Sequence, residues 1–240
     1  MLCACFASGE MRAFLAEAEA SGLTPDITCY DVLLSKLQLE GRAEAVGALV
    51  REVGARGLEL DEVMRATLER TEDSLSRIRT AVLQQALSGD ADQRAAAHGF
   101  FDTLLQHRAA DSYHLGVMLH GCRTSREQRE LLKRAEAAGQ PPDAGCFNVV
   151  LGRLQLEGRQ EDVPALLREM EVRGVAQDEY IEATLARTDA TLSRKRTFEL
   201  KRLLGGGDKG RAAARAMYEE LLRRGLVTGH ELGVMLQDCT

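Results

Sequence analysis

Residues 37–42 read Leu37-Gln38-Leu39-Glu40-Gly41-Arg42, and the same six residues recur as Leu154-Gln155-Leu156-Glu157-Gly158-Arg159. The offset between the two copies is 154 − 37 = 117 residues. Two other stretches repeat with this offset: Leu115-Gly116-Val117-Met118-Leu119 returns at 232–236, and Ser76-Arg77 returns at 193–194. One offset over the whole chain means that no insertion or deletion separates the copies. The sequence therefore predicts two tandem 117-residue units, 1–117 and 118–234, with 235–240 as the start of a further repeat.

The composition of the 240-residue chain favours helix. Ala, Leu, Glu and Arg dominate, aromatic residues make up 4 %, and alternating β-branched runs are absent. These dominant side chains lose little rotamer freedom in a helix, so we predict an all-α fold. No apolar stretch approaches the ~20 residues needed to span a bilayer, and no targeting segment is visible. The net charge of −6 gives no global attraction to phosphate.

Each unit contains an expected helical hairpin around its Glu-Gly-Arg stretch. Glycine suits the end of one helix and the tight turn into the next. Apolar residues recur every three or four positions on both sides of that turn, which indicates two amphipathic helices. In the first unit these stripes are Val32, Leu33 and Leu37, then Ala45, Leu49 and Val53. Because a lone hairpin cannot bury its apolar face, we expect neighbouring hairpins to stack on it.

Two segments of 35 residues, 27–61 and 144–178, carry a family pattern (61 − 27 + 1 = 35). The second reads Cys146-Phe147-Asn148-Val149-Val150-Leu151, then Gly158-Arg159, Met170, Gly174 and Asp178. It resembles a pentatricopeptide repeat, with an aromatic-led first helix, a Gly-Arg turn, a second helix and a terminal Asp. The family resemblance implies a right-handed α-solenoid of stacked helix-turn-helix repeats. A tetratricopeptide array is the nearest alternative fold.

The rest of the chain fits the same pattern less closely. Segments 112–143 and 1–26 resemble shorter repeats that close on Gly-x-x-Pro-Asp. Segments 62–111 and 179–228, of 50 residues each (111 − 62 + 1 = 50), predict a short helix, a longer one and a closing helix.

The family resemblance implies single-stranded RNA binding in a mitochondrion or plastid, with one base read by each helical pair. The two reading positions fall on Asn148 with Asp178, a pair that tends to favour uracil in the family, and on Asp31 with Asp61 in the first copy. An amide offers a base edge both a donor and an acceptor, whereas two carboxylates make a poor reader. Each terminal Asp is also a suitable N-cap for the helix that follows it.

Basic residues supply candidate phosphate contacts, with a solvated helix face as the alternative interpretation. They are Arg194, Lys195, Arg196, Lys201 and Arg202, echoed by Arg77 and Arg79 in the first copy.

Five of the six cysteines follow the repeat, because Cys5, Cys122 and Cys239 share one position and Cys29 and Cys146 share another. Recurrence once per unit does not gather metal ligands at one point, so we expect small buried residues and no metal site. We find no nucleophile with a base and no phosphate-loop spacing. The sequence thus predicts a protein without enzymatic activity, cofactor or small-molecule substrate.

Two hypotheses for the partner remain. The chain binds single-stranded RNA, or it is a scaffold or adaptor subunit of a large organellar complex, such as a ribosome or a membrane-bound energy complex, and binds protein. The acidic charge and the single good reading pair favour the second, and the family resemblance favours the first.

Overall fold

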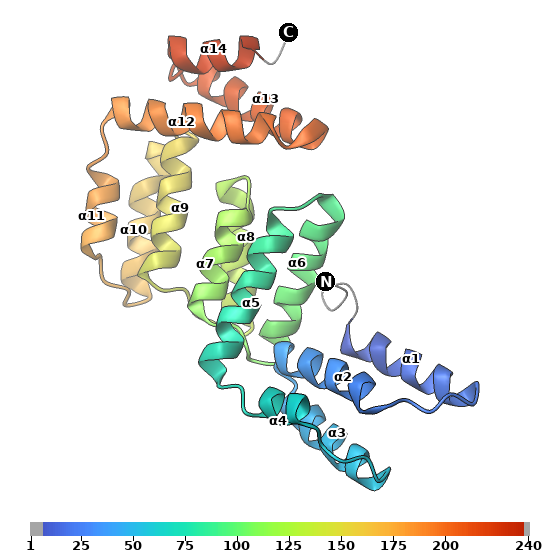
Figure 1. The fold of residues 1–240 in the computed structure, drawn as a ribbon. Helices are drawn as coiled ribbons and strands as arrows, with labels where there is room; N and C mark the ends of the chain where they lie inside the picture. The colour runs from blue at the N-terminus through green and yellow to red at the C-terminus, as the bar shows by residue number, and fades with distance from the viewer. Residues whose placement is uncertain (1–6, 238–240) are drawn as a thin grey trace. The chain divides into compact units, whose positions relative to one another are not determined.

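The computed structural model describes residues 7–237. In that part of the chain it contains fourteen α-helices, one 3-10 helix and no strand (Figure 1), which confirms the all-α prediction. The elements are α1 (Ser8–Ala20), α2 (Ile27–Leu39), α3 (Ala43–Ala55), α4 (Glu62–Leu68), α5 (Glu72–Leu87), α6 (Ala91–Gln106), α7 (Ser112–Gly121), α8 (Ser125–Ala137), α9 (Ala144–Leu156), η2 (Gln160–Asp162), α10 (Val163–Val172), α11 (Glu179–Leu185), α12 (Asp189–Leu204), α13 (Gly207–Arg223) and α14 (Gly229–Gln237). Among the described residues, no helix has the length and apolarity needed to cross a membrane.

Helix boundaries recur with the offset of the sequence repeat. Helices α8, α9, α11 and α12 begin and end 117 residues after α1, α2, α4 and α5, as in 144 − 27 and 156 − 39. The counterpart of α3 is split into η2 and α10, where Pro164 stands in the first turn of α10. Proline is tolerated there because the first turn of a helix has no intrahelical use for the missing N–H.

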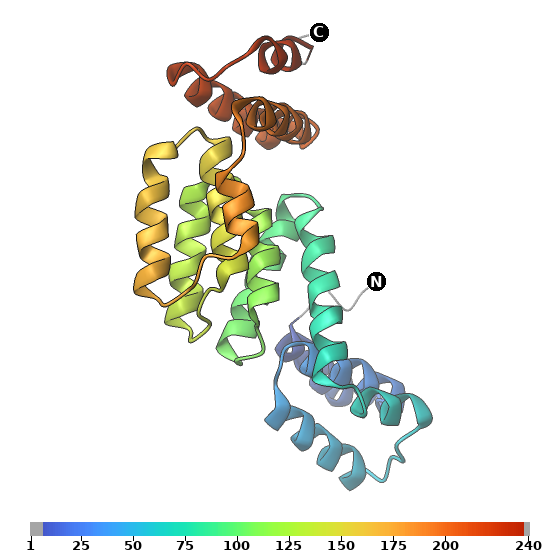
Figure 2. The ribbon, with the colours of Figure 1, turned by 90° about the vertical axis from the view of Figure 1, so that its left-hand side faces the viewer.

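The chain divides into two compact units, which we describe separately. Unit 1 comprises Met1–Met118 with Ala135–Gln140, and unit 2 comprises Leu119–Arg134 with Pro141–Thr240. In unit 1, α2 contacts α1, α3, α4 and α5, and α5 contacts α6. In unit 2, α9 contacts α10, α11 and α12, and α12 contacts α13 and α14. Helices α9, α10 and α11 lie side by side in both Figure 1 and Figure 2.

The core of unit 1 forms where the α2–α3 hairpin meets α4. Its fully buried members are Tyr30, Leu33, Leu34, Leu37, Leu49, Val53 and Met64. The predicted stripes are thus confirmed at Leu33, Leu37, Leu49 and Val53. Val32 was predicted to be in the stripe but is 39 % exposed, because the buried face of α2 follows positions 30, 33, 34 and 37.

The Glu-Gly-Arg stretch ends one helix and starts the next through a Schellman motif. Gly41 and Gly158 have φ values of 75° and 71°, in the left-handed region that glycine adopts without strain. The N–H of Gly41 donates to Gln38 O (3.1 Å) and the N–H of Arg42 donates to Leu37 O (2.9 Å). These two bonds satisfy carbonyls that the helix leaves open. The repeated glycine is therefore a conformational requirement of the hairpin.

The glutamate of the same stretch caps the helix that precedes the hairpin. Glu40 accepts from Ser8 N (2.9 Å) and Ser8 Oγ (2.5 Å), and all of these groups are buried. In unit 2, Glu157 accepts in the same way from Ser125 N (2.7 Å) and Ser125 Oγ (2.5 Å). A carboxylate at a helix N-terminus satisfies free N–H groups and opposes the positive end of the helix dipole. Glutamate and glycine thus recur together because the glutamate joins two helices and the glycine reverses the direction of the chain.

The cysteine prediction is confirmed at two positions and wrong at one. Cys122 and Cys146 are buried, and this burial raises the pKa of each thiol to about 12. Cys29, in the first turn of α2, is exposed even though its counterpart Cys146 is buried. The repeat fixes position along a helix but not what covers that position. Cys3, Cys5 and Cys239 lie outside the described residues.

Candidate functional site

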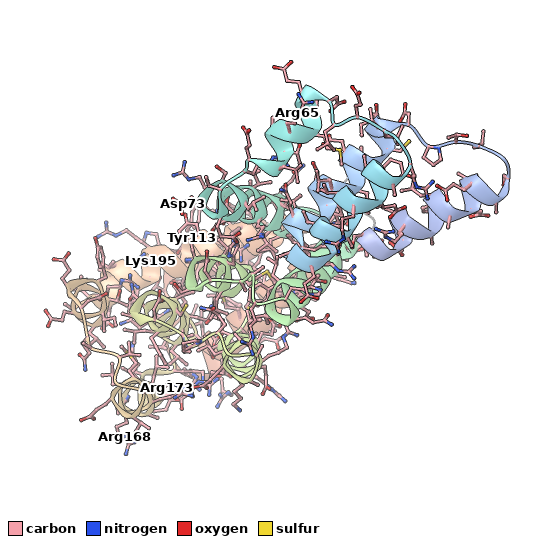
Figure 3. The ribbon with its side chains drawn as sticks, turned by 90° about the horizontal axis from the view of Figure 1, so that it is seen from below. Arg65, Asp73, Tyr113, Arg168, Arg173 and Lys195 are labelled. Atoms are coloured by element: carbon pink, nitrogen blue, oxygen red, sulfur yellow. The ribbon has the colours of Figure 1, made fainter. Side chains whose placement is uncertain are left out.

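Unit 2 contains a cleft of about 540 Å³ between α9 and α12. The residues of α12 that line the cleft are separated by three or four positions, so they lie on one face of the helix. That face carries Thr191, Arg194, Lys195 and Phe198, of which Lys195 is labelled in Figure 3. The cleft is lined by His120, Gln128, Asn148, Val149, Gly152, Arg153, Leu156, Arg187, Thr191, Arg194, Lys195, Phe198 and Glu199.

Cations dominate the charge of this cleft. Among residues 7–237, no carboxylate forms an ion pair with Arg187, Arg194 or Lys195. Arg187 is half-buried between α11 and α12 and donates to Gln155 Oε1 (3.3 Å), and desolvation lowers the pKa of its guanidinium. A partly desolvated cation without a counter-ion attracts an anion more strongly than a solvated one. The charge of the cleft therefore favours a negatively charged ligand over a positively charged one.

Glu199, the one carboxylate among the described residues that line the cleft, is neutralised by neighbouring arginines. Glu199 is 7 % exposed and accepts from Arg153 (2.7 Å) and, at both oxygens, from Arg202 (2.8 Å each). Burial by itself would raise the pKa of Glu199, but the hydrogen bonds and charges of Arg202 and Arg153 outweigh it and lower that pKa from 4.5 to about 2. Glu199 thus stays ionised and holds Arg153 against the cleft wall.

We expect this network to make the stability of unit 2 depend on acid pH. A carboxyl group with a lowered folded-state pKa contributes stability above its unfolded pKa, and that stability is lost as the pH falls from 4.5 towards about 2. The contribution is on the order of 2 kcal/mol after allowance for the screening of Arg202, which is half exposed. Between about pH 7 and about pH 3, Glu199→Gln should lose about 1 kcal/mol less stability than the natural chain in urea unfolding, because a folded-state pKa of about 2 leaves part of the contribution in place at pH 3. Glu182→Gln, at an exposed site, is the control, and equal losses in all three proteins would contradict this role of Glu199.

Asn148 lines the cleft, and its amide oxygen has no hydrogen-bond partner. Its side chain is half-buried, and its Oδ1 is covered and has no hydrogen-bond partner. Asp31, its counterpart in unit 1, likewise has a covered Oδ1 without a partner. Covered polar atoms without partners are uncommon in folded proteins. Asn148 therefore lines the cleft with an acceptor that is unsatisfied but covered by the protein.

The terminal aspartates that the sequence paired with these residues act as helix caps. Asp178 accepts from Ile181 N (2.9 Å) at the start of α11, and Asp61 accepts from Met64 N (2.8 Å) at the start of α4. Asp178 does not line the cleft that contains Asn148. The capping interpretation of both residues is thereby confirmed.

The basic candidates separate into three groups. Arg194 and Lys195 line the cleft, whereas Lys201 and Arg77 are exposed outside it, and Arg202 pairs with Glu199. The prediction of phosphate contact is wrong for Arg79 and Arg196, which are 1 % and 3 % exposed. Their guanidinium groups donate to backbone carbonyls at the ends of α2 and α9.

Sequence reasoning missed Arg187, Phe198 and His120. Phe198 follows Lys195 by three residues, so helical spacing could have placed it beside the basic pair; its side chain is 70 % exposed. Desolvation and the charge of Arg153 lower the pKa of His120. In unit 1 the counterparts of Lys195 and Phe198 are Ile78 and Ala81, so the repeat does not duplicate this set.

No protein-family model matches the sequence, and no curated protein matches it.

Proposed function

We propose that the protein binds single-stranded RNA and that the cleft of unit 2 is its main contact. One observation carries this proposal: three cations that form no ion pair with any described residue share a cleft with a 70 % exposed phenylalanine and the amide of Asn148. Proteins that bind single strands combine a positive groove for the backbone with aromatic side chains on which bases stack. Arg187, Arg194 and Lys195 supply the first feature, Phe198 the second, and Asn148 a contact to a base edge.

The proposal also covers the architecture of the protein and its location in an organelle. The 117-residue recurrence of helix boundaries and the Glu-Gly-Arg hairpins support two tandem units of a right-handed α-solenoid. The resemblance of segments 27–61 and 144–178 to pentatricopeptide repeats supports an organellar RNA as the partner. RNA binding then belongs mainly to unit 2, because unit 1 has Asp31 where unit 2 has Asn148.

A scaffold that binds protein is the alternative. It is favoured by large apolar side chains outside the cleft, of which Val172 and Tyr180 are 86 % and 66 % exposed. Interface cores are enriched in aromatic side chains such as that of tyrosine. On this alternative, substitutions in the cleft leave the partner bound and substitutions at Val172 release it.

Titration of the purified chain with labelled U-rich and A-rich single strands at two salt concentrations tests the RNA proposal. We expect binding that weakens with salt, and Phe198→Ala should weaken it about tenfold, near the lower end of the ~1–3 kcal/mol measured for base stacking. Lys195→Ala should weaken it as well and make it less sensitive to salt, because one phosphate contact is lost. Asn148→Ala should reduce discrimination between the two strands.

Lys201→Ala is the matched control, since Lys201 is an exposed lysine on α12 outside the cleft. It should change the affinity by less than about twofold, because a charge away from the bound strand is screened by salt. Absence of binding at low salt would overturn the proposal, and so would binding that ignores both salt and the cleft variants.

A further inference from the structure

Helix α9 contains a glycine that neither its backbone nor its packing requires. Gly152 lies inside α9, and its φ is not in the left-handed region. A Cβ built on Gly152 would meet, outside its own helix, one described atom within 4 Å, which is Arg187 Nη1 at 3.5 Å, an ordinary contact distance. Glycine is among the residues least suited to a helix interior. The feature that distinguishes glycine here is therefore its effect on Arg187, the one side chain that a larger residue would touch.

The equivalent residue in unit 1 is a serine, and it binds the equivalent arginine. Position 152 corresponds to Ser35 (152 − 117 = 35) and position 187 to Arg70 (187 − 117 = 70). Arg70 Nη1 donates to Ser35 Oγ (3.2 Å). Gly152 has no side chain that could accept, and Arg187 Nη1 donates instead to Gln155 Oε1 (3.3 Å). The residue at this position of the helix thus determines the partner of the arginine.

Two equivalent glutamines show the same difference. Gln38 Nε2 donates to Thr67 O (2.8 Å) in unit 1. Gln155 Nε2 donates to Thr184 O (2.8 Å) in unit 2, so both amides are anchored in the same way. Gln155 Oε1 accepts from Arg187, whereas Gln38 Oε1 is covered and has no hydrogen-bond partner. Because the anchors are alike, the unpartnered oxygen of Gln38 follows from the arginine of unit 1, which donates to the serine instead.

We propose that Gly152 is a positioning residue of the cleft, because it leaves Arg187 available to bind a phosphate group of the single strand. Arg187 lines the cleft and makes one hydrogen bond in the described part of the chain, so most donors of its guanidinium stay open. A guanidinium with open donors binds a phosphate through two parallel hydrogen bonds. In unit 1, Ser35 holds Arg70, so that arginine does not provide a second phosphate site. This inference rests on the proposed binding of RNA and assigns one of its phosphate contacts.

Gly152→Ser gives unit 2 the residue of unit 1 and tests the proposal. In titrations of the full chain with the labelled U-rich strand, it should weaken binding about fivefold, near the upper limit for one exposed charge pair. The slope of log K against log salt should become shallower by about 0.7, because one phosphate contact to a single strand is lost. Gly152→Ala is the matched control: it adds the same Cβ without a hydroxyl, so the affinity should stay within about twofold and the slope should not change. Both variants should remain folded, because alanine and serine are better helix formers than glycine.

A double substitution and the structure of the variant separate this inference from the RNA proposal. Combined with Arg187→Ala, Gly152→Ser should weaken binding no further, because it acts through the arginine. In a crystal structure of the Gly152→Ser chain without RNA, Arg187 Nη1 should lie within hydrogen-bond distance of the introduced hydroxyl. Equal weakening by Gly152→Ser and Gly152→Ala, or an unchanged position of Arg187, would overturn the positioning role and leave RNA binding in place. Absence of strand binding by the natural chain would overturn both proposals.

Discussion

Replacing Gly41 with alanine should lower the free energy of unfolding of unit 1 by about 4 kcal/mol. Gly41 has a φ of 75°, where an L-residue is strained by roughly 1–2 kcal/mol. A Cβ built on Gly41 would also lie 2.2 Å from Ala109 Cβ, so the backbone after α6 would have to move. Overpacking of this kind costs typically ~1–3 kcal/mol. Urea unfolding followed by circular dichroism measures the change.

Gly57 provides a matched control for the overpacking contribution. It has a similar φ of 72°, but a Cβ there would meet nothing within 4 Å. Gly57→Ala should therefore cost only about 1–2 kcal/mol, the conformational strain alone. Equal destabilisation by the two substitutions would show that Gly41 is required only for its backbone conformation and that its contact with Ala109 carries no energy.

The hairpins could be predicted because their signals are local. Glycine at the helix end and Asp61 or Asp178 before the next helix act through backbone groups within a few residues. The three-helix pattern of 62–111 is observed as α4, α5 and α6 for the same reason. Local signals do not specify which element packs against each face of a helix. Val32 and Cys29 were therefore predicted to be buried, although both are exposed.

Helical spacing predicts which of the basic residues on α5 are buried. Arg79 stands four residues after Leu75 and four before Leu83, and both leucines are buried. Its place on the apolar stripe predicts burial, whereas Arg77, two positions earlier, points to solvent. A prediction based on positive charge alone treats Arg77 and Arg79 alike, although helical spacing separates the exposed arginine from the buried one.

The cleft itself depends on contacts between distant segments. Asn148 and Arg187 are 39 residues apart (187 − 148), and the cleft joins them only because α9 packs against both α11 and α12. A single sequence contains no measure of that packing. The unpartnered amide oxygen of Asn148 and the desolvation of Arg187 are consequences of tertiary structure and could be found only there.

Replacing Arg79 with methionine should destabilise unit 1 by about 4 kcal/mol, since each hydrogen bond to a charged group contributes roughly 1.5–3 kcal/mol. Arg79 donates to Leu39 O (2.9 Å) and Gln38 O (2.8 Å) at the end of α2 and pairs with Glu72. Methionine keeps most of the buried volume but offers no donor, so the carbonyls of Leu39 and Gln38 each lose a charged hydrogen-bond partner, and the bond to Gln38 O is buried. Urea unfolding measures the total, and hydrogen exchange at the end of α2 locates it.

Arg77→Met separates this function from general loss of positive charge. Arg77 is exposed on the same helix, and its replacement should change the free energy of unfolding by less than about 0.5 kcal/mol. Arg196→Met should reproduce the effect in unit 2, because Arg196 donates to Leu156 O and Gln155 O at the end of α9. Similar small effects of the Arg77 and Arg79 substitutions would mean that the buried guanidinium gives back in desolvation what its hydrogen bonds contribute. A large effect confined to Arg79 and Arg196 would establish that Arg79 joins α5 to the α2–α3 hairpin and that Arg196 joins α12 to the α9–α10 hairpin.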